Sequence, residues 1–400
     1  MLLRELKYLK NYQSIFRNSK SLSNSLLKYL FDSVFTVKSM TMHGKYYDEE
    51  KSRQQKLLTG KSFVFDGIEN NGTVTFYNEK TKNTFSRTFP FCIEDSQRVV
   101  NLYSSIREEC IDYFKKEEIA FHQAGYSDKK SFEVPNHILE SQIACLNHLF
   151  AIRHDPRIVK ALAEAIMQNT CDSVYEVKCE HKTQPAYIAF EVVSGEDHLN
   201  ELHGKTKIPM RGSMCTSIDA LIIAEKDGRK ILIPIEWKYT ESYHEHKDYS
   251  AEITGRYWKG LTRLNSYTPL LKTSKYVNGK IIGPHPEQPY QNTIFFIEPF
   301  YQLMRQTLWV EQMIKHKDSE WVDADDYCHI HVIPSGNQDL LIHQYPYTQY
   351  DTLESAWRHA LTLAGNERYK IIDPKDIVKV ISQFDNNENK KLVEYLSTRY

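Results

Sequence analysis

Two apolar stretches, residues 217–223 and 231–238, lie on either side of a short polar segment. Apolar side chains alternate onto both faces of each stretch, which is typical of strands that are covered on both sides. One face carries Leu221, Ile223 and Leu232, and the other carries Ala220, Ile222, Ile233 and Ile235. The Asp227-Gly228 dipeptide between them predicts a hairpin, because glycine tolerates the positive φ of a type I′ turn.

A two-residue loop at this turn determines which residues face each other across the hairpin. It places Asp219 opposite Glu236, with Lys238 on the same face as Glu236. Pro234 lies inside the second stretch and cannot donate to a β-ladder, so we expect a bulge or bend there.

The hairpin therefore brings two carboxylates and one ammonium group, those of Asp219, Glu236 and Lys238, to the end of an apolar sheet. The carboxylates repel each other unless a cation neutralises them, and hard oxygen ligands suit Mg²⁺ or Mn²⁺. A neighbouring lysine can activate water or stabilise charge on a phosphate, as metal-assisted phosphodiester hydrolysis requires. The alternative is an exposed ion pair without a catalytic role, but the apolar surroundings favour a site, since unpaired buried charges are costly.

This pattern resembles the PD-(D/E)XK nuclease superfamily, the restriction-endonuclease-like proteins, in which an acidic residue on one strand precedes E-x-K on the next. Asp219, Glu236 and Lys238 match that signature, although Ile218 takes the place of the usual proline. The resemblance implies an α/β fold with a mixed central sheet flanked by helices. It also implies a Mg²⁺- or Mn²⁺-dependent endonuclease acting on DNA, with RNA as an open alternative substrate.

A narrower resemblance extends over about residues 136–335. There the chain is similar to an uncharacterised bacterial branch of restriction-endonuclease-like proteins, in residues 215–220, 235–242 and 301–307. We therefore expect the nuclease-like core at 131–335. Around it we expect a helical extension at 1–40, a small β-containing accessory region at 41–130 and a helical accessory region at 336–400.

Two further acidic residues are candidates for a supporting metal ligand. Glu140 lies at the start of a predicted helix, where the nuclease fold often contributes a carboxylate, but a first-turn glutamate behind an Asn136 cap explains it equally well. Glu191 lies within the apolar stretch 187–193, which predicts the first core strand. We expect one of the two carboxylates to support the site.

Candidate contacts to nucleic acid come from polar residues near the core. They are Arg211, Arg256, Gln302, Arg305 and Gln306. Each has an ordinary alternative: a solvated loop for Arg211, and the polar face of an amphipathic helix for the others. Paired histidines such as His329 and His331 lack a supporting cysteine quartet, so zinc is not expected.

Helical spacing predicts further elements along the chain. We expect helices at 99–116, two helices within 136–168 that break at Pro156, and helices at 300–315, 352–364 and 376–384, with a strand at 327–334.

Composition limits the alternatives. Hydrophobic residues make up 41% of the 400-residue chain, which is ample for a core, and the formal net charge is −1, so any nucleic-acid surface must be local. The seven cysteines form no C-x-x-C pair and no signal peptide or membrane span is evident, which predicts a cytoplasmic protein without disulfides.

The near-neutral charge keeps a catalytically silent nucleic-acid-binding or interaction module as the alternative function. A homodimer is a further possibility, because two-fold symmetry with facing sites would suit cleavage of both strands of a duplex.

Overall fold

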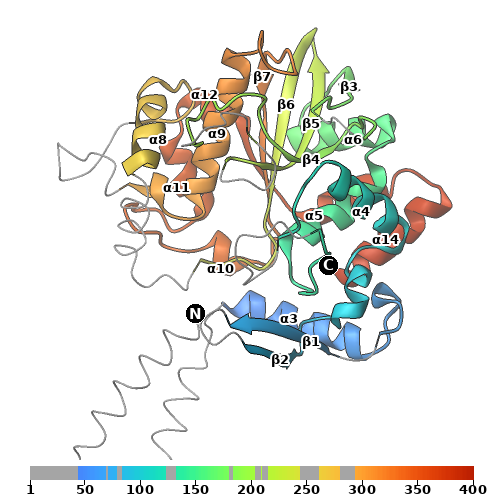
Figure 1. The fold of residues 1–400 in the computed structure, drawn as a ribbon. Coiled ribbons are helices and arrows are strands. Elements are labelled where there is room, and N and C mark those ends of the chain that lie inside the picture. The colour runs from blue at the N-terminus through green and yellow to red at the C-terminus, as the bar shows by residue number, and fades with distance from the viewer. Residues whose placement is uncertain are drawn as a thin grey trace, which may run out of the picture.

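The computed structural model describes residues 44–68, 71–78, 83–122, 132–179, 183–202, 209, 215–243, 261–279 and 293–400. Within these residues a seven-stranded sheet forms the centre of the molecule, with the strand order β3-β5-β6-β8-β9 (Figure 1). In addition, β4 pairs with β5, and β7 pairs with β6. The strands are β3 (Ser173–Tyr175), β4 (Ala189–Val192), β5 (Ile218–Lys226), β6 (Arg229–Trp237), β7 (Asp326–Tyr327), β8 (His329–Val332) and β9 (Tyr369–Ile372).

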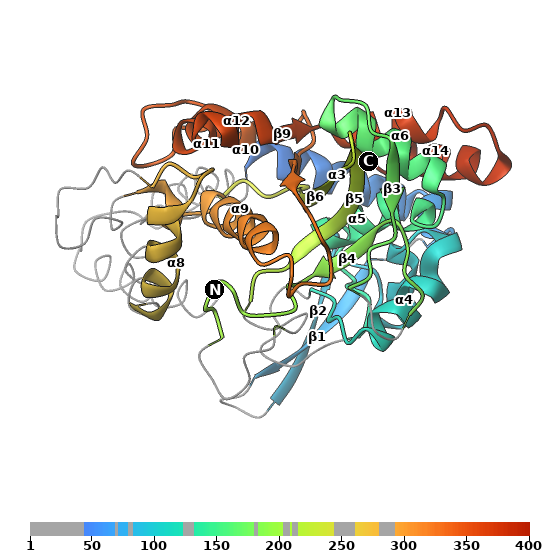
Figure 2. The same ribbon diagram turned by 90° about the horizontal axis from the view of Figure 1, so that it is seen from above.

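The sheet is mixed. Strand β5 pairs antiparallel with β3, β4 and β6, whereas β6 pairs parallel with β7 and β8, and β8 pairs parallel with β9. Helices cover both of its faces, as the view from above shows (Figure 2). The predicted α/β fold with a mixed central sheet and flanking helices is confirmed.

Two hydrophobic cores separate the layers. The first core packs one face of the sheet against α5 (Ser141–Leu149), α6 (Pro156–Met167), α13 (Pro374–Ile381) and α14 (Asn387–Arg399). The second packs the opposite face against α8 (Leu261–Thr273), α9 (Phe300–Lys315) and α11 (Leu353–Ala360). The apolar residues of the hairpin divide between the cores as their alternation predicts, with Ala220 in the first and Leu221 in the second.

The hairpin between β5 and β6 has the predicted turn and register. Asp227 and Gly228 both adopt positive φ, 52° and 71°, as a type I′ turn requires. The pairing continues to Ala220 opposite Ile235, and the next pair in this register is Asp219 and Glu236.

The bulge expected at Pro234 does not form. Pro234 pairs in register with Leu221 on β5. On its other side the ladder is interrupted instead, because β7 pairs with β6 up to Leu232 and β8 pairs with it from Ile235. A residue without an N–H is tolerated where no ladder bond is made.

Most predicted helices lie where expected. The helix predicted at 300–315 is α9, and the two predicted within 136–168 are α5 and α6, with Asp155 capping α6 through a bond from Arg157 N. The region 99–116 begins with 3₁₀ turns and becomes α-helical in α4 (Arg107–Lys116). The other helices are α3 (Lys45–Thr59), α10 (Gln338–Leu341) and α12 (Leu363–Arg368), and a separate hairpin joins β1 (Gly72–Asn78) to β2 (Asn83–Phe89).

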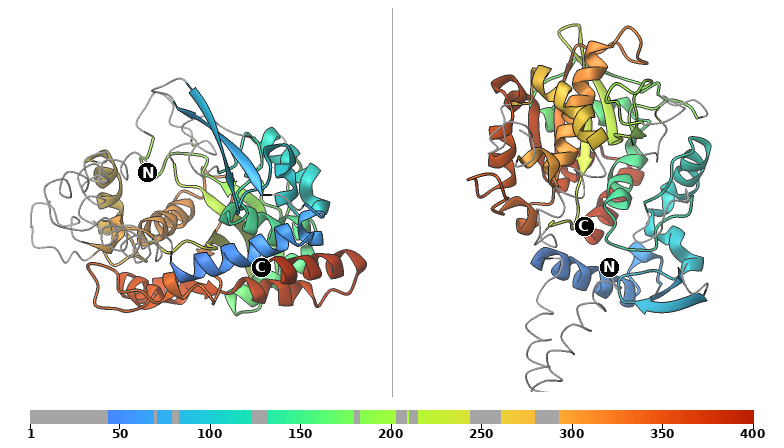
Figure 3. Two further views of the ribbon diagram at one scale, coloured as in Figure 1. Left: turned by 90° about the horizontal axis from the view of Figure 1, so that it is seen from below. Right: turned by 60° about the vertical axis from the view of Figure 1, so that its left-hand side comes forward.

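The C-terminal region contributes a strand as well as helices. Strand β9 pairs with β8 along four residues, so the region expected to be helical extends the central sheet. Helix α14 lies beside α3 (Figure 3), and Arg53 of α3 donates to Thr398 O over 3.1 Å. The domain boundaries themselves stay a prediction.

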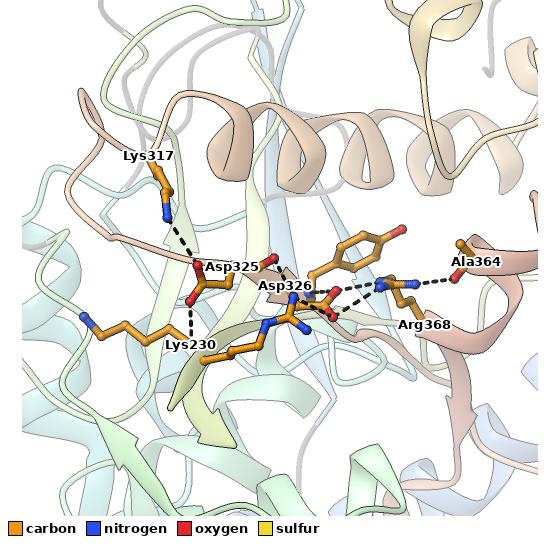
Figure 4. A network of polar contacts seen from close by, with 8 residues as sticks. Lys230, Lys317, Asp325, Asp326, Ala364 and Arg368 are labelled. Carbon is orange, nitrogen blue, oxygen red and sulfur yellow. Dashed lines mark hydrogen bonds and ion pairs between the residues drawn. The ribbon is translucent and has the colours of Figure 1, made fainter. Parts of the chain in front are cut away.

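A polar network at the turn end of the sheet joins β6 and β7 to α12 and to the segment that follows α9 (Figure 4). Asp326 on β7 accepts from Arg368 Nε over 2.6 Å, and Arg368 Nη1 donates to Ala364 O. Asp325 accepts from Lys317 Nζ and from Lys230 N. These bonds anchor the start of β6, and the far end of this strand carries Glu236.

No helix among the described residues is long and apolar enough to cross a membrane.

Candidate active site

Three carboxylates occupy corresponding positions on three neighbouring strands. The pairing of Phe190 with Ala220 and of Val192 with Ile218 places Glu191 on β4 at the level of Asp219 on β5. Asp219 in turn is level with Glu236 on β6, at the opposite end of this strand from the turn. Glu191 itself has a φ of 51° and forms no ladder pair, so the edge strand is locally distorted at this carboxylate.

Asp219 closes the β5–β6 ladder with its side chain. Its Oδ2 accepts the backbone N–H of Trp237 over 2.8 Å. Burial and the charges of Glu236 and Glu191 raise the pKa of Asp219 well above its usual range, although Lys238 and the Trp237 bond act in the opposite direction. Lys238 and the Trp237 bond thus only partly offset the effects of burial and of the two neighbouring carboxylates.

Glu236 and Lys238 form a buried ion pair. Lys238 Nζ lies 2.5 Å from Glu236 Oε1, and only 3% of Glu236 and 5% of Lys238 are exposed. Burial acts to lower the pKa of Lys238, but the charges of Glu236, Tyr243 and Glu241 outweigh it and raise this pKa well above the ordinary value. Lys238 is therefore a permanent cation, suited to stabilising negative charge rather than to accepting a proton from water.

Helix α9 supplies two glutamines to this ion pair. Gln302 Oε1 accepts from Lys238 Nζ over 2.6 Å, and Gln306 Nε2 donates to Glu236 Oε2. On its far side Gln306 Oε1 lies 3.0 Å from His329 Nε2 of β8. The glutamines predicted to contact nucleic acid thus bond to the acidic and basic residues of the site.

The two candidate supporting carboxylates have different surroundings. Glu191 accepts from Gln142 Nε2 over 2.7 Å and from Ser217 Oγ over 2.8 Å, and its charge acts on Asp219. Glu140 occupies the position before α5 and makes no side-chain cap bond. Burial and the charge of Glu241 raise the pKa of Glu140 to about 8.

These contacts favour Glu191 over Glu140 as the third acidic residue of the site. The alternative for Glu140 needed Asn136 as a helix cap, but the Asn136 amide donates to Asp95 instead, over 2.9 Å. A glutamate in the first helical turn is also not what the structure has, since the helix begins at Ser141.

Arg305 of α9 is held by a buried acidic residue. Its Nε lies 3.2 Å from Glu201 Oε1 and donates to Thr216 Oγ1 over 3.1 Å. Tyr267 also donates to Glu201. Arg305 is thus ion-paired within the protein, and its contact with nucleic acid stays a prediction. The other two basic candidates, Arg211 and Arg256, lie outside the described residues.

The donor set can be compared with the needs of a hard divalent cation. Among the described residues no three His, Cys, Asp or Glu side chains form a ready-made metal cluster. Mg²⁺ commonly binds through one or two carboxylates and keeps several waters, so a site of this kind does not require a third protein ligand. Burial raises the pKa of Asp219 most, and the charges of Glu236 and Glu191 raise it further; a cation would offset the part that comes from these charges.

Sequence reasoning missed two residues of this arrangement. His329 was set aside with the other paired histidines, yet it is 1% exposed and bonds to Gln306. Glu201 was not singled out, although it anchors Arg305. The strand spacing of His329 and His331 places His329 on one face of the sheet, but only the position of α9 shows that it lies near Glu236.

Comparison with known protein families places most of the chain in a described family. A family model, REase-ARP, described as Restriction Endonuclease associating with ARP, matches residues 66–400. No curated protein and no solved structure matches the chain. The family match includes β1, β2 and the C-terminal helices, and so extends beyond the segment 136–335 that carried the sequence resemblance.

Proposed function

Because the chain belongs to the REase-ARP family of restriction-endonuclease-like proteins, we propose that it is a metal-dependent nuclease of the PD-(D/E)XK type that hydrolyses phosphodiester bonds of DNA. Asp219 and Glu236 are the proposed ligands of Mg²⁺ or Mn²⁺, and Lys238 is the proposed catalytic cation. Glu191 supports the acidic pair. Association with ARP, which the family description names, is a proposal for this chain as well.

The observation that carries this proposal is the alignment of three carboxylates beside one buried ammonium group. Glu191, Asp219 and Glu236 lie level on adjacent strands, and the charge of Lys238 acts on Asp219 against those of the two glutamates. Such an imbalance of buried charge is costly for a purely structural cluster, and a divalent cation would offset it.

Each residue has a defined part in the reaction. When bound, the metal would polarise the phosphate and lower the pKa of a coordinated water. Asp219 and Glu236 would orient the cation, while Lys238, kept positive by its neighbours, would stabilise the charge that develops on the phosphate oxygens. Gln302 holds the Lys238 ammonium from the helix side, so this charge has a fixed position.

A cleavage assay tests the proposal directly. Purified protein is incubated with supercoiled plasmid DNA and with a structured RNA, in Mg²⁺, in Mn²⁺ and in EDTA. We expect the plasmid to be nicked or linearised only with metal, and Asp219→Asn to remove this activity while the circular dichroism spectrum is unchanged. Cleavage in EDTA, or full activity of Asp219→Asn, would refute the assignment.

One observation favours a second function, a catalytically silent nucleic-acid-binding module. Both carboxylate oxygens of Glu236 already have partners, Lys238 on Oε1 and Gln306 on Oε2. In a silent module this ion pair would be structural. Such a protein would retard labelled DNA in a gel, with or without EDTA, and would leave plasmid and RNA uncut under every metal condition.

A further inference from the structure

Gln306 is held between a carboxylate and a buried imidazole. On one side its Nε2 donates to Glu236 Oε2, and on the other its Oε1 lies 3.0 Å from His329 Nε2. Gln306 is 4% exposed and His329 is 1% exposed, so the protein itself must satisfy both side chains. A third contact lies behind the ring, where Thr307 Oγ1 is 3.3 Å from His329 Nδ1.

The direction of every hydrogen bond in this chain follows from the charge on Glu236. A carboxylate paired with Lys238 only accepts, so Gln306 must present its amide nitrogen to Glu236. The amide oxygen then faces His329, and this ring must donate through Nε2–H. Its Nδ1 is left without a proton and accepts from the Thr307 hydroxyl.

The protonation state of His329 agrees with this arrangement. Burial lowers the pKa of His329 to about 4, although the charge of Glu236 acts in the opposite direction. The ring is therefore neutral near pH 7 and carries a single proton. A neutral ring has two tautomers, and only the Nε2–H form can donate to Gln306.

We propose that His329 is a positioning residue for Glu236, holding the Gln306 amide nitrogen toward this carboxylate by donating from Nε2–H. The inference rests on the proposed function in one respect, because it takes Glu236 to be a metal ligand. Without the His329 donor the amide is free to rotate, and its oxygen would then repel Glu236 Oε2. Partners of metal ligands that lie outside the coordination sphere commonly change metal affinity about 10–100-fold.

The first experiment measures the tautomer and needs neither metal nor substrate. Protein labelled with ¹⁵N in the histidine rings is examined by two-bond ¹H–¹⁵N NMR at pH 7, and His329→Gln assigns the signal. We expect the Nε2–H tautomer. An Nδ1–H tautomer or an imidazolium ring would require a different orientation of Gln306 and would overturn the inference.

The second experiment measures Mn²⁺ affinity by titration calorimetry in matched variants. We expect His329→Leu to weaken binding at least about tenfold, while His329→Gln, whose amide nitrogen replaces Nε2, stays within about threefold of wild type. His148→Leu is the control for loss of a buried imidazole, because His148 packs on Trp237 at the opposite face of the sheet and should leave affinity unchanged.

These outcomes separate the inference from the proposed function. If His329→Leu bound Mn²⁺ with wild-type affinity, the positioning role would be overturned. If His329→Leu does not fold, Gln306→Leu is measured instead, because it removes the other partner of the same hydrogen bond. A wild-type protein that binds no Mn²⁺ contradicts the metal site. In that case the tautomer alone decides whether His329 orients Gln306.

Discussion

The backbone N–H of Trp237 donates to Asp219 Oδ2 over 2.8 Å, at the point where the β5–β6 ladder ends. A carboxylate thus takes the place of the main-chain acceptor beside the proposed metal site. Burial and the charges of Glu236 and Glu191 nevertheless raise the pKa of Asp219 well above its ordinary value. The folded protein therefore binds a proton here at pH values where the unfolded chain has released it.

Asp219→Asn should stabilise the metal-free protein, and increasingly so as the pH rises. Near pH 4, around the ordinary pKa of an aspartate, the wild-type carboxyl is protonated in the folded state and resembles the amide. Stability is lost as the pH rises through the raised folded-state pKa, because a buried charge forms and is repelled by Glu236 and Glu191. Urea unfolding in EDTA at pH 4, 6 and 8 measures the difference in free energy between the two proteins.

The same measurement with Mg²⁺ provides the control. Bound cation offsets the repulsion in the wild type and has little to bind in Asp219→Asn, so the order of stability should reverse. A difference that does not change with pH in EDTA would contradict the charge cluster.

Gly228→Ala should destabilise the protein by about 1 kcal/mol, the conformational cost of a side chain at positive φ. Gly228 has a φ of 71°, and no described atom beyond its two chain neighbours lies within 4 Å of the place where a Cβ would stand, so no clash adds to this cost. Asp227→Asn is the control, because asparagine tolerates the left-handed region and should be nearly neutral. Urea denaturation checks both variants. Equal stability of wild type and Gly228→Ala would argue against the type I′ turn.

The hairpin was predictable because its determinants are local. An Asp-Gly turn sets the register of β5 against β6, and the register alone aligns Asp219 with Glu236. Helix α9 was equally predictable, since its apolar spacing is regular over the whole length of Phe300–Lys315.

What could not be predicted depends on contacts between segments far apart in the chain. Strand β9 is short and half apolar, and only its pairing with β8 makes it part of the sheet. Likewise His329 acquires its role from Gln306 of α9, and no spacing in the sequence relates the two residues. The positive φ of Glu191 could not be predicted either, because the apolar stretch around it has the pattern of a regular strand.

Tyr239→Phe should lower the free energy of unfolding by about 1–3 kcal/mol, the cost of leaving buried polar groups unpaired. The Tyr239 hydroxyl donates to Glu50 Oε2 over 2.7 Å and accepts from Gln54 Nε2 over 2.9 Å, joining α3 to the segment after Lys238. Tyr175→Phe removes an exposed tyrosine–glutamate bond on the same sheet and should cost little. Similar losses for both variants in urea would show that α3 is not fastened through Tyr239.

Lys238→Met tests whether the ion pair between Glu236 and Lys238 has a catalytic or only a structural role. Removing one partner of a buried pair costs about 3–5 kcal/mol, since among the described residues the Glu236 carboxylate then keeps Gln306 alone as a polar partner. Cleavage should fall at least about 100-fold, as for loss of a group that stabilises charge in the transition state. Mn²⁺ affinity should instead rise, because Glu236 Oε1 is released from the ammonium group.

Opposite changes in metal affinity and cleavage are the signature of this prediction. Titration calorimetry and plasmid nicking are measured on the same preparation. Lys226→Met is the control, since Lys226 lies at the turn end of the same hairpin and its ammonium group bonds to Asn169, away from Glu236. If Lys238→Met weakened Mn²⁺ binding and cleavage together, Lys238 would be holding the site in shape. If Lys238→Met cleaved at the wild-type rate, the Lys238 ammonium would have no part in the mechanism, although it is the described cation that lies closest to Glu236.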